Sequence, residues 1–193
     1  MKKEIKPYKQ NGPTCAIVCM MMILYANDLL EDFSYSEEMR LYEMYKSQSM
    51  GGTPFSALAL HLGKCGLKTE LFHSEKKYFS NKRKLISDYI FNHALEEYKE
   101  YIKKAEQEGL KVYNEVDITN DLLKMKLKSN NLIIAAGTHE NALHAVLICE
   151  YDDTGFYLYD PLYCEKLHKS YKSVKDFMKT DIGKWFLSVE IKS

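Results

Sequence analysis

Residues 10–24 read QNGPTCAIVCMMMIL, and this stretch decides the expected fold. Asn11, Gly12 and Pro13 are typical of a turn, and Thr14 is a residue type that often caps a helix. Residues 16–24, which follow, are all apolar. A helix that is apolar on every side is buried in a core rather than amphipathic. We therefore expect a buried helix that begins at Cys15, directly behind the turn.

The rest of the N-terminal part is also expected to be largely helical. The turn Gly51-Gly52-Thr53-Pro54 introduces one of these helices, and a narrow apolar stripe among many charges predicts a surface helix or helical hairpin over residues 81–107. The expected helices cover residues 36–46, 55–62, 81–107 and 119–128, and a short strand covers residues 68–73.

The C-terminal part is expected to be rich in β-strands. Residues 152–155 form a hairpin-turn signal between two apolar runs. The expected strands cover residues 132–136, 144–149, 156–159 and 186–191, with one helix at 174–179. Helices first and an antiparallel sheet last define the α+β class, and 193 residues predict a single domain spanning 1–193.

Composition narrows the classes of function. The chain holds 27 Lys and Arg against 27 Asp and Glu, and its hydrophobic fraction is 46%. This hydrophobic fraction excludes a disordered or collagen-like chain. A net charge of zero gives no electrostatic footprint for nucleic acid or for an anionic membrane surface. We therefore expect a folded domain without a nucleic-acid partner.

The cysteine count and the N-terminal sequence bear on the cellular compartment of the protein. Five cysteines are an odd number, which fits a reducing compartment better than a disulfide framework. Lysines before the apolar run mimic a secretory signal, but Asn11-Gly12-Pro13 interrupts that pattern. The run is also shorter than the roughly 20 apolar residues that span a bilayer. We expect a cytoplasmic protein with no stable membrane insertion.

Cys15 is a candidate nucleophile. It lies at the first turn of the expected helix, where free backbone N–H groups and the helix dipole favour the thiolate. The side-chain amide of Gln10, five residues upstream, could donate a hydrogen bond to an oxyanion beside the sulfur. The alternative is that Cys15 is a small hydrophobic residue at a helix start.

His144 and Asp160 are the candidate partners of Cys15. His144 opens an apolar strand, and Asp160 ends the next one. Antiparallel pairing across a four-residue turn brings the two side chains together, so that the carboxylate binds one ring nitrogen and the other faces a thiol. The alternative is a structural core histidine. His139, in the expected loop 137–141, is a second candidate base.

Metal ligation is the weaker interpretation of the cysteines. Cys15 with Cys19, and Cys164 with His168, have the i, i+4 spacing of possible ligand pairs. The paired-ligand grouping of a zinc site is not present in the sequence, so a zinc site is not expected. Acyl transfer through a cysteine needs no metal and no cofactor, and we expect neither.

Several of these segments together resemble a known family. Gln10 to Ala16, followed by a Met-rich helix, is similar to the nucleophile helix of the bacteriocin-processing (double-glycine) cysteine peptidases of the papain-like clan. Three further segments resemble the same family and occur in the same order as in the family: residues 51–63, the histidine strand 143–148 with Asp160-Pro161, and residues 174–177 with Trp185. The resemblance covers about two-thirds of the chain and skips a helical insertion at about 74–128, where we expect specificity to lie.

The resemblance implies a papain-like fold and a cysteine peptidase that acts on a peptide or protein substrate. It implies Cys15 as nucleophile, His144 as general base and then acid, and Asp160 as the carboxylate that orients the imidazole. Gln10 and the Cys15 backbone N–H would stabilise the oxyanion.

The chain departs from the family pattern at two points. Ala16 follows the cysteine where the family usually has glycine, and the interval from Gln10 to Cys15 is one residue short. Three alternatives remain open: an amidase or deamidase, an acyltransferase on the same fold, and a non-catalytic peptide-binding module.

Overall fold

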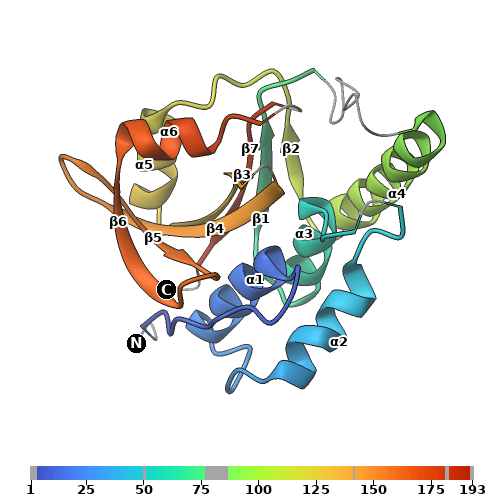
Figure 1. Ribbon diagram of the computed structural model, residues 1–193, viewed down its shortest axis with the longest axis horizontal. Helices are drawn as coiled ribbons and strands as arrows, with labels where there is room; N and C mark the ends of the chain where they lie inside the picture. The colour runs from blue at the N-terminus through green and yellow to red at the C-terminus, as the bar shows by residue number, and fades with distance from the viewer. Residues whose placement is uncertain (1–3, 50, 77–86, 141, 181–182, 192–193) are drawn as a thin grey trace.

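The computed structural model describes residues 4–49, 51–76, 87–140, 142–180 and 183–191, and forms one sheet with helices on both faces (Figure 1). The helices are α1 (Cys15–Ala26), α2 (Tyr35–Tyr45), α3 (Phe55–Lys64), α4 (Asp88–Gln107), α5 (Asn120–Lys128) and α6 (Tyr171–Phe177). The strands are β1 (Thr69–His73), β2 (Lys111–Tyr113), β3 (Asn131–His139), β4 (Ala142–Tyr151), β5 (Gly155–Asp160), β6 (Glu165–Ser170) and β7 (Trp185–Glu190). The α+β class is confirmed.

The sheet is mixed, so the prediction of an antiparallel sheet confined to the C-terminal part is wrong. Its strand order is β2-β1-β7-β3-β4-β5-β6, and β1 pairs with β2 in parallel. The other neighbours are antiparallel. Parallel neighbours require a long crossover connection, and the chain that contains α4 provides it. A central part of the sequence therefore supplies two strands of the sheet.

The sheet separates two hydrophobic cores, because successive strand residues point to opposite faces. Ile134 packs with α1, α2 and α3, whereas its neighbour Ile133 packs with α5 and α6. Figure 1 shows α1 between the sheet and α2, with α5 and α6 across the sheet. The larger core therefore lies on the α1 face.

Helix α1 is the buried helix that the sequence predicts. Residues 16–24 are at most 6% exposed, and the helix packs against β4. It begins at Cys15, as expected, but Thr14 does not cap it with its side chain. The hydroxyl of Thr14 instead donates a hydrogen bond to Glu38 on α2. The start of α1 is therefore tied to the neighbouring helix.

Three other differences from the sequence expectations concern element boundaries. Strand β3 extends to His139, so that residue is in a strand and not in a loop. Strands β2 and β6 were not expected, and both are short and mainly exposed. Helix α4 is a single helix rather than a hairpin over Asp88–Gln107, and residues 81–86 of the expected helix lie outside the described residues.

Candidate active site

The start of α1 presents Cys15 to the surface of the core. The Cys15 side chain is half-buried, in contrast to Cys19 one turn later, which is fully buried. Both are free thiols. Burial raises the pKa of the Cys19 thiol well above its usual value, so Cys19 remains protonated. Of these two cysteines, only Cys15 combines access with the free N–H groups of a helix start.

The register of β4 and β5 brings His144 to Asp160. Leu147 pairs with Tyr159, and continuing that register places Val146 beside Asp160. His144 lies two residues before Val146 and therefore shares its strand face. His144 Nε2 is 2.8 Å from Asp160 Oδ1, and both residues are buried, with exposures of 7% and 9%. The predicted histidine–aspartate pair is present.

The second ring nitrogen of His144 is available to the nucleophile. Cys15 and His144 line the same cavity, and because Nε2 binds Asp160, Nδ1 is the nitrogen left for the thiol. Burial lowers the pKa of His144, but the hydrogen bonds and charges of Asp160 and Cys15 outweigh burial and raise it from 6.5 to about 9. At neutral pH the imidazole is therefore protonated beside the Asp160 carboxylate.

Asp160 remains ionised beside this imidazolium. Burial raises the pKa of Asp160, but hydrogen bonds from His144 and from the Leu162 backbone N–H outweigh burial and lower it below its usual value. The same turn reaches the segment before the nucleophile, because the Gln10 N–H donates to the Pro161 carbonyl at 2.9 Å. The aspartate turn and the nucleophile segment are thus held to each other.

Gln10 lines the same cavity as Cys15 and His144, so the structure brings all four predicted residues together. The Gln10 side chain donates from Nε2 to the Gly12 carbonyl at 2.6 Å. Its Oε1 is buried and has no hydrogen-bond partner among the described residues. An amide nitrogen carries two hydrogens, so one remains for another acceptor.

The sequence interpretation missed Glu38. This residue of α2 is fully buried, and its carboxylate accepts from the Asn11 N–H and from Asn11 Nδ2, both at 2.8 Å, and from the Thr14 hydroxyl. Burial and this carboxylate together raise the pKa of Tyr8. A periodic signal was available, because residues 38, 41, 42 and 45 share one helix face and are all buried. Glu38 fixes the turn that precedes the nucleophile.

Glu38→Gln is expected to loosen this turn. The substitution places an amide where one carboxylate oxygen now accepts, which leaves a buried donor facing Asn11 or Thr14. We expect a loss of about 1–3 kcal/mol in the free energy of unfolding and slower alkylation of Cys15. Chemical denaturation and iodoacetamide labelling measure the two effects.

Glu37→Gln is the matched control. Glu37 directly precedes Glu38 in the chain but forms a surface ion pair with Arg40 at 2.7 Å. Surface pairs contribute about 0–1 kcal/mol, so this variant is expected to unfold almost like the wild type. Equal stability and labelling rates for the two variants would contradict the role given to Glu38.

The ring of His144 also has support from α6. Phe177 packs edge-on against it, with ring centroids 6.3 Å apart. Gly137, which pairs with His144 across β3 and β4, makes room for this phenylalanine: a Cβ on Gly137 would lie 2.4 Å from the Phe177 ring. The close approach explains why glycine occupies this strand position.

The other candidates from the sequence are not arranged in the same way. His139 lies near His144, with ring centroids 5.7 Å apart, but Asp160 binds His144. His168 Nε2 contacts Asp152 Oδ1 at 3.3 Å instead of pairing with Cys164. Across the described ranges, no group of three or more His, Cys, Asp or Glu side chains could hold a metal ion.

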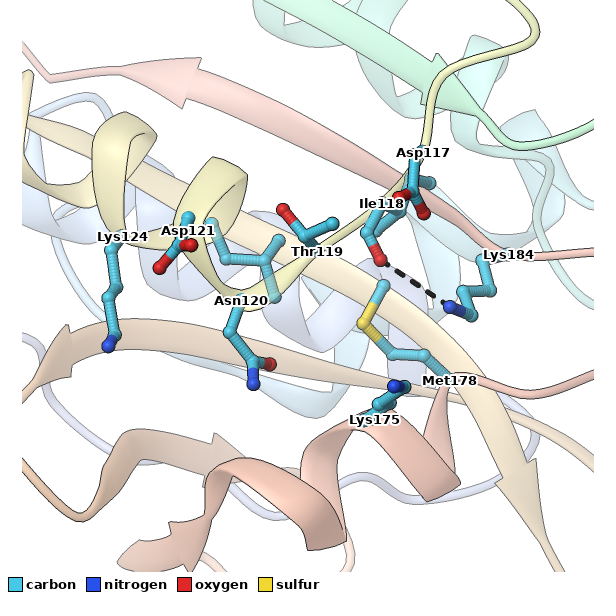
Figure 2. A pocket seen from close by; sticks show the side chains of 10 residues that line it. Asp117, Ile118, Thr119, Asn120, Asp121, Lys124, Lys175, Met178 and Lys184 are labelled. Carbon is cyan, nitrogen blue, oxygen red and sulfur yellow. Dashed lines mark hydrogen bonds between the residues drawn. The ribbon is translucent and has the colours of Figure 1, made fainter.

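Two cavities among the described residues are candidate binding sites. The one that contains Cys15 and His144 has a volume of about 670 Å³. The other, of about 330 Å³, lies between the start of α5 and α6. Figure 2 shows Lys184 in it, donating to the Ile118 carbonyl at 3.4 Å. The described residues that line it include lysines and aspartates but no cysteine or histidine. The larger cavity is therefore the candidate active site.

Comparison of the chain with protein-family models and with curated proteins finds no match in either set. Within the described residues, no helix is both long enough and apolar enough to cross a membrane. The interpretation of the site therefore rests on its residues and their geometry.

Proposed function

We propose that this protein is a cysteine peptidase with a papain-like fold, in which Cys15 attacks a peptide amide. One observation carries the proposal: Cys15, at the start of α1, lines the same cavity as His144, and His144 Nε2 lies 2.8 Å from the Asp160 carboxylate. A nucleophile, a base in contact with it and a group that orients the base are the requirements of covalent acyl transfer.

The proposed reaction has two steps, acylation of Cys15 and hydrolysis of the resulting thioester. The Cys15 thiolate attacks the amide carbon, the C–N bond breaks, and His144 gives its proton to the departing amine. A thioester remains. The neutral His144 then takes a proton from water, the hydroxide adds to the thioester carbon, and the C–S bond breaks to release a carboxylic acid. Asp160 holds the imidazole in position throughout both steps.

The oxyanion formed in each step requires donors beside the sulfur. The backbone N–H of Cys15 is one, because the first N–H groups of a helix have no partner within the helix. The free hydrogen on Gln10 Nε2 is the other, since that side chain lines the same cavity.

Digestion of a defined peptide library in oxygen-18-labelled water tests this function. Hydrolysis of the thioester places one labelled oxygen in each new carboxyl terminus, which mass spectrometry detects. A deamidase instead changes glutamine side chains without cutting the chain, and an acyltransferase forms a new amide with an added amine. No change in any peptide would support a peptide-binding module and contradict the proposal.

A further inference from the structure

The candidate active-site cavity extends beyond the catalytic residues to an aromatic end. Phe55 of α3, Tyr98 of α4 and Trp185 of β7 line it, and each is only 4–6% exposed. The rings of Phe55 and Trp185 meet edge-on with centroids 6.4 Å apart. A volume of about 670 Å³ is far larger than the reacting amide requires. The cavity as a whole therefore has room for more of the substrate than the reacting amide.

Helix α4 supplies one wall of this end through Ala94 and Tyr98. The Tyr98 hydroxyl lies 3.3 Å from His73 Nε2, and His73 Nδ1 lies 3.2 Å from Asn114 Oδ1. Burial lowers the pKa of His73 to about 4, so this chain of hydrogen bonds is uncharged at neutral pH. The Tyr98 side chain in this wall is thus positioned by hydrogen bonds to neutral groups.

In the described part of the chain, the lining near the aromatic end carries no charged side chain and is mainly apolar, with the hydroxyl groups of Ser47 and Thr53 as its polar members. None of the described residues that line the cavity is a lysine or arginine, and the acidic residue at its edge, Glu140, has a side chain that is 87% exposed. Many of the remaining lining residues are small: Ala16, Ala94, Ala136, Ala142 and Ala145. Apolar walls with few polar groups bind apolar ligands.

We propose that this end of the cavity binds a bulky apolar side chain in the acyl part of the substrate, and that α4 sets this preference. The inference rests on the proposed function. The departing amine must lie beside His144, which protonates it, so the acyl part extends from the sulfur toward α3 and α4. Helix α4 lies in the segment that the family resemblance skips, so the preference belongs to this chain.

Peptidyl acyloxymethyl ketones, which alkylate an activated cysteine, test the preference. In acetyl-Xaa-Gly and acetyl-Gly-Xaa probes, Xaa is varied through Gly, Ala, Leu and Phe, and the rate of Cys15 labelling is followed by mass spectrometry. In at least one series we expect the Leu or Phe probe to react about 30-fold faster than the Gly probe, as burial of several methylene groups predicts. Equal labelling rates for all probes in both series would overturn the inference. This result needs only the wild-type protein.

Ala94→Leu fills the cavity from α4 and is expected to reduce that ratio to about 5 or less, since overpacking excludes the bulky group. Asn92→Leu adds the same side chain at an exposed position of the same helix, and is expected to keep the wild-type ratio. An unchanged ratio in Ala94→Leu contradicts the role of α4.

Labelling with iodoacetamide distinguishes failure of the specificity proposal from failure of the proposed function. This small reagent needs only an activated Cys15, so Asn92→Leu is expected to be labelled by it at the wild-type rate. Fast iodoacetamide labelling without a preference among the peptidyl probes overturns the specificity alone. Slow labelling by all reagents overturns the proposed function, and the specificity with it.

Discussion

Cys15→Ala is expected to abolish peptide cleavage, with a fall of about 10,000-fold or more in the rate of hydrolysis. The sulfur forms the only covalent bond to the substrate in the proposed reaction, and no neighbouring side chain can replace it. Cys15 is half-buried at the start of α1, and alanine leaves the helix and its core intact. Mass-spectrometric analysis of a peptide library treated with the variant measures the loss.

Cys164→Ala is the matched control for this substitution. Cys164 is also a free, half-buried thiol, but it lies outside the cavity at a turn before β6. We expect full cleavage activity for this variant and unchanged melting temperatures for both variants. Cleavage products from Cys15→Ala in wild-type amounts would exclude Cys15 as the nucleophile.

Asp160→Ala is expected to lower the cleavage rate by about 100-fold to 10,000-fold. Without the carboxylate, only Cys15 still opposes the effect of burial at His144, so the pKa of the imidazole falls from about 9. The ring also loses the 2.8 Å hydrogen bond that orients it. Kinetics of cleavage as a function of pH measure both effects.

Asp160→Asn separates orientation from charge. The amide can still accept a hydrogen bond from His144 Nε2 but carries no charge. We expect this variant to recover much of the rate lost in Asp160→Ala. Equal rates for the two variants would mean that the charge, rather than the orientation, is what Asp160 provides.

The stability of the folded state is expected to depend on pH because of the His144–Asp160 pair. Because folding raises the pKa of His144 from 6.5 to about 9, the protonated form stabilises the folded state. This contribution is complete below about pH 6.5 and is lost as the pH rises through about 9. Melting temperatures of the wild type should therefore decline over this range more steeply than those of His144→Ala.

The parts of the fold that carry strong local signals could be predicted from the sequence. The uniformly apolar residues 16–24 define α1, and the turn at 152–155 predicts the hairpin of β4 and β5. In both cases the signal lies within a few residues of the element it predicts. The cysteine, the histidine and the aspartate could therefore be placed in one site. A bulge between Ile148 and Glu150, which the sequence does not signal, shifts the register by one residue and puts Asp160 on the strand face of His144.

The parts that depend on distant contacts could not be predicted. Strand β6 reads EKLHKS and is almost entirely exposed, so it lacks the apolar alternation of a half-buried strand. The parallel pairing of β1 with β2 depends on a crossover through α4, which no local pattern specifies. Glu38 was missed because its partners, Asn11 and Thr14, are 27 and 24 residues away in the chain.

The central claim is that Cys15 and His144 form a thiolate–imidazolium pair. Its most direct test is iodoacetamide labelling of the folded protein between about pH 5 and pH 9, with each modified cysteine identified by mass spectrometry. An ordinary cysteine with a pKa of about 8.5 is only about 0.3% thiolate at pH 6. A thiolate held by an imidazolium is already reactive at that pH.

We predict that Cys15 is labelled at pH 6 at least about 10-fold faster than Cys65 or Cys164, allowing for the weaker nucleophilicity of a stabilised thiolate. His144→Ala should remove this advantage, because no imidazolium then stabilises the sulfur. Labelling of Cys15 no faster than that of Cys65 and Cys164, with no effect of His144→Ala, would contradict the activated pair and favour a peptide-binding module.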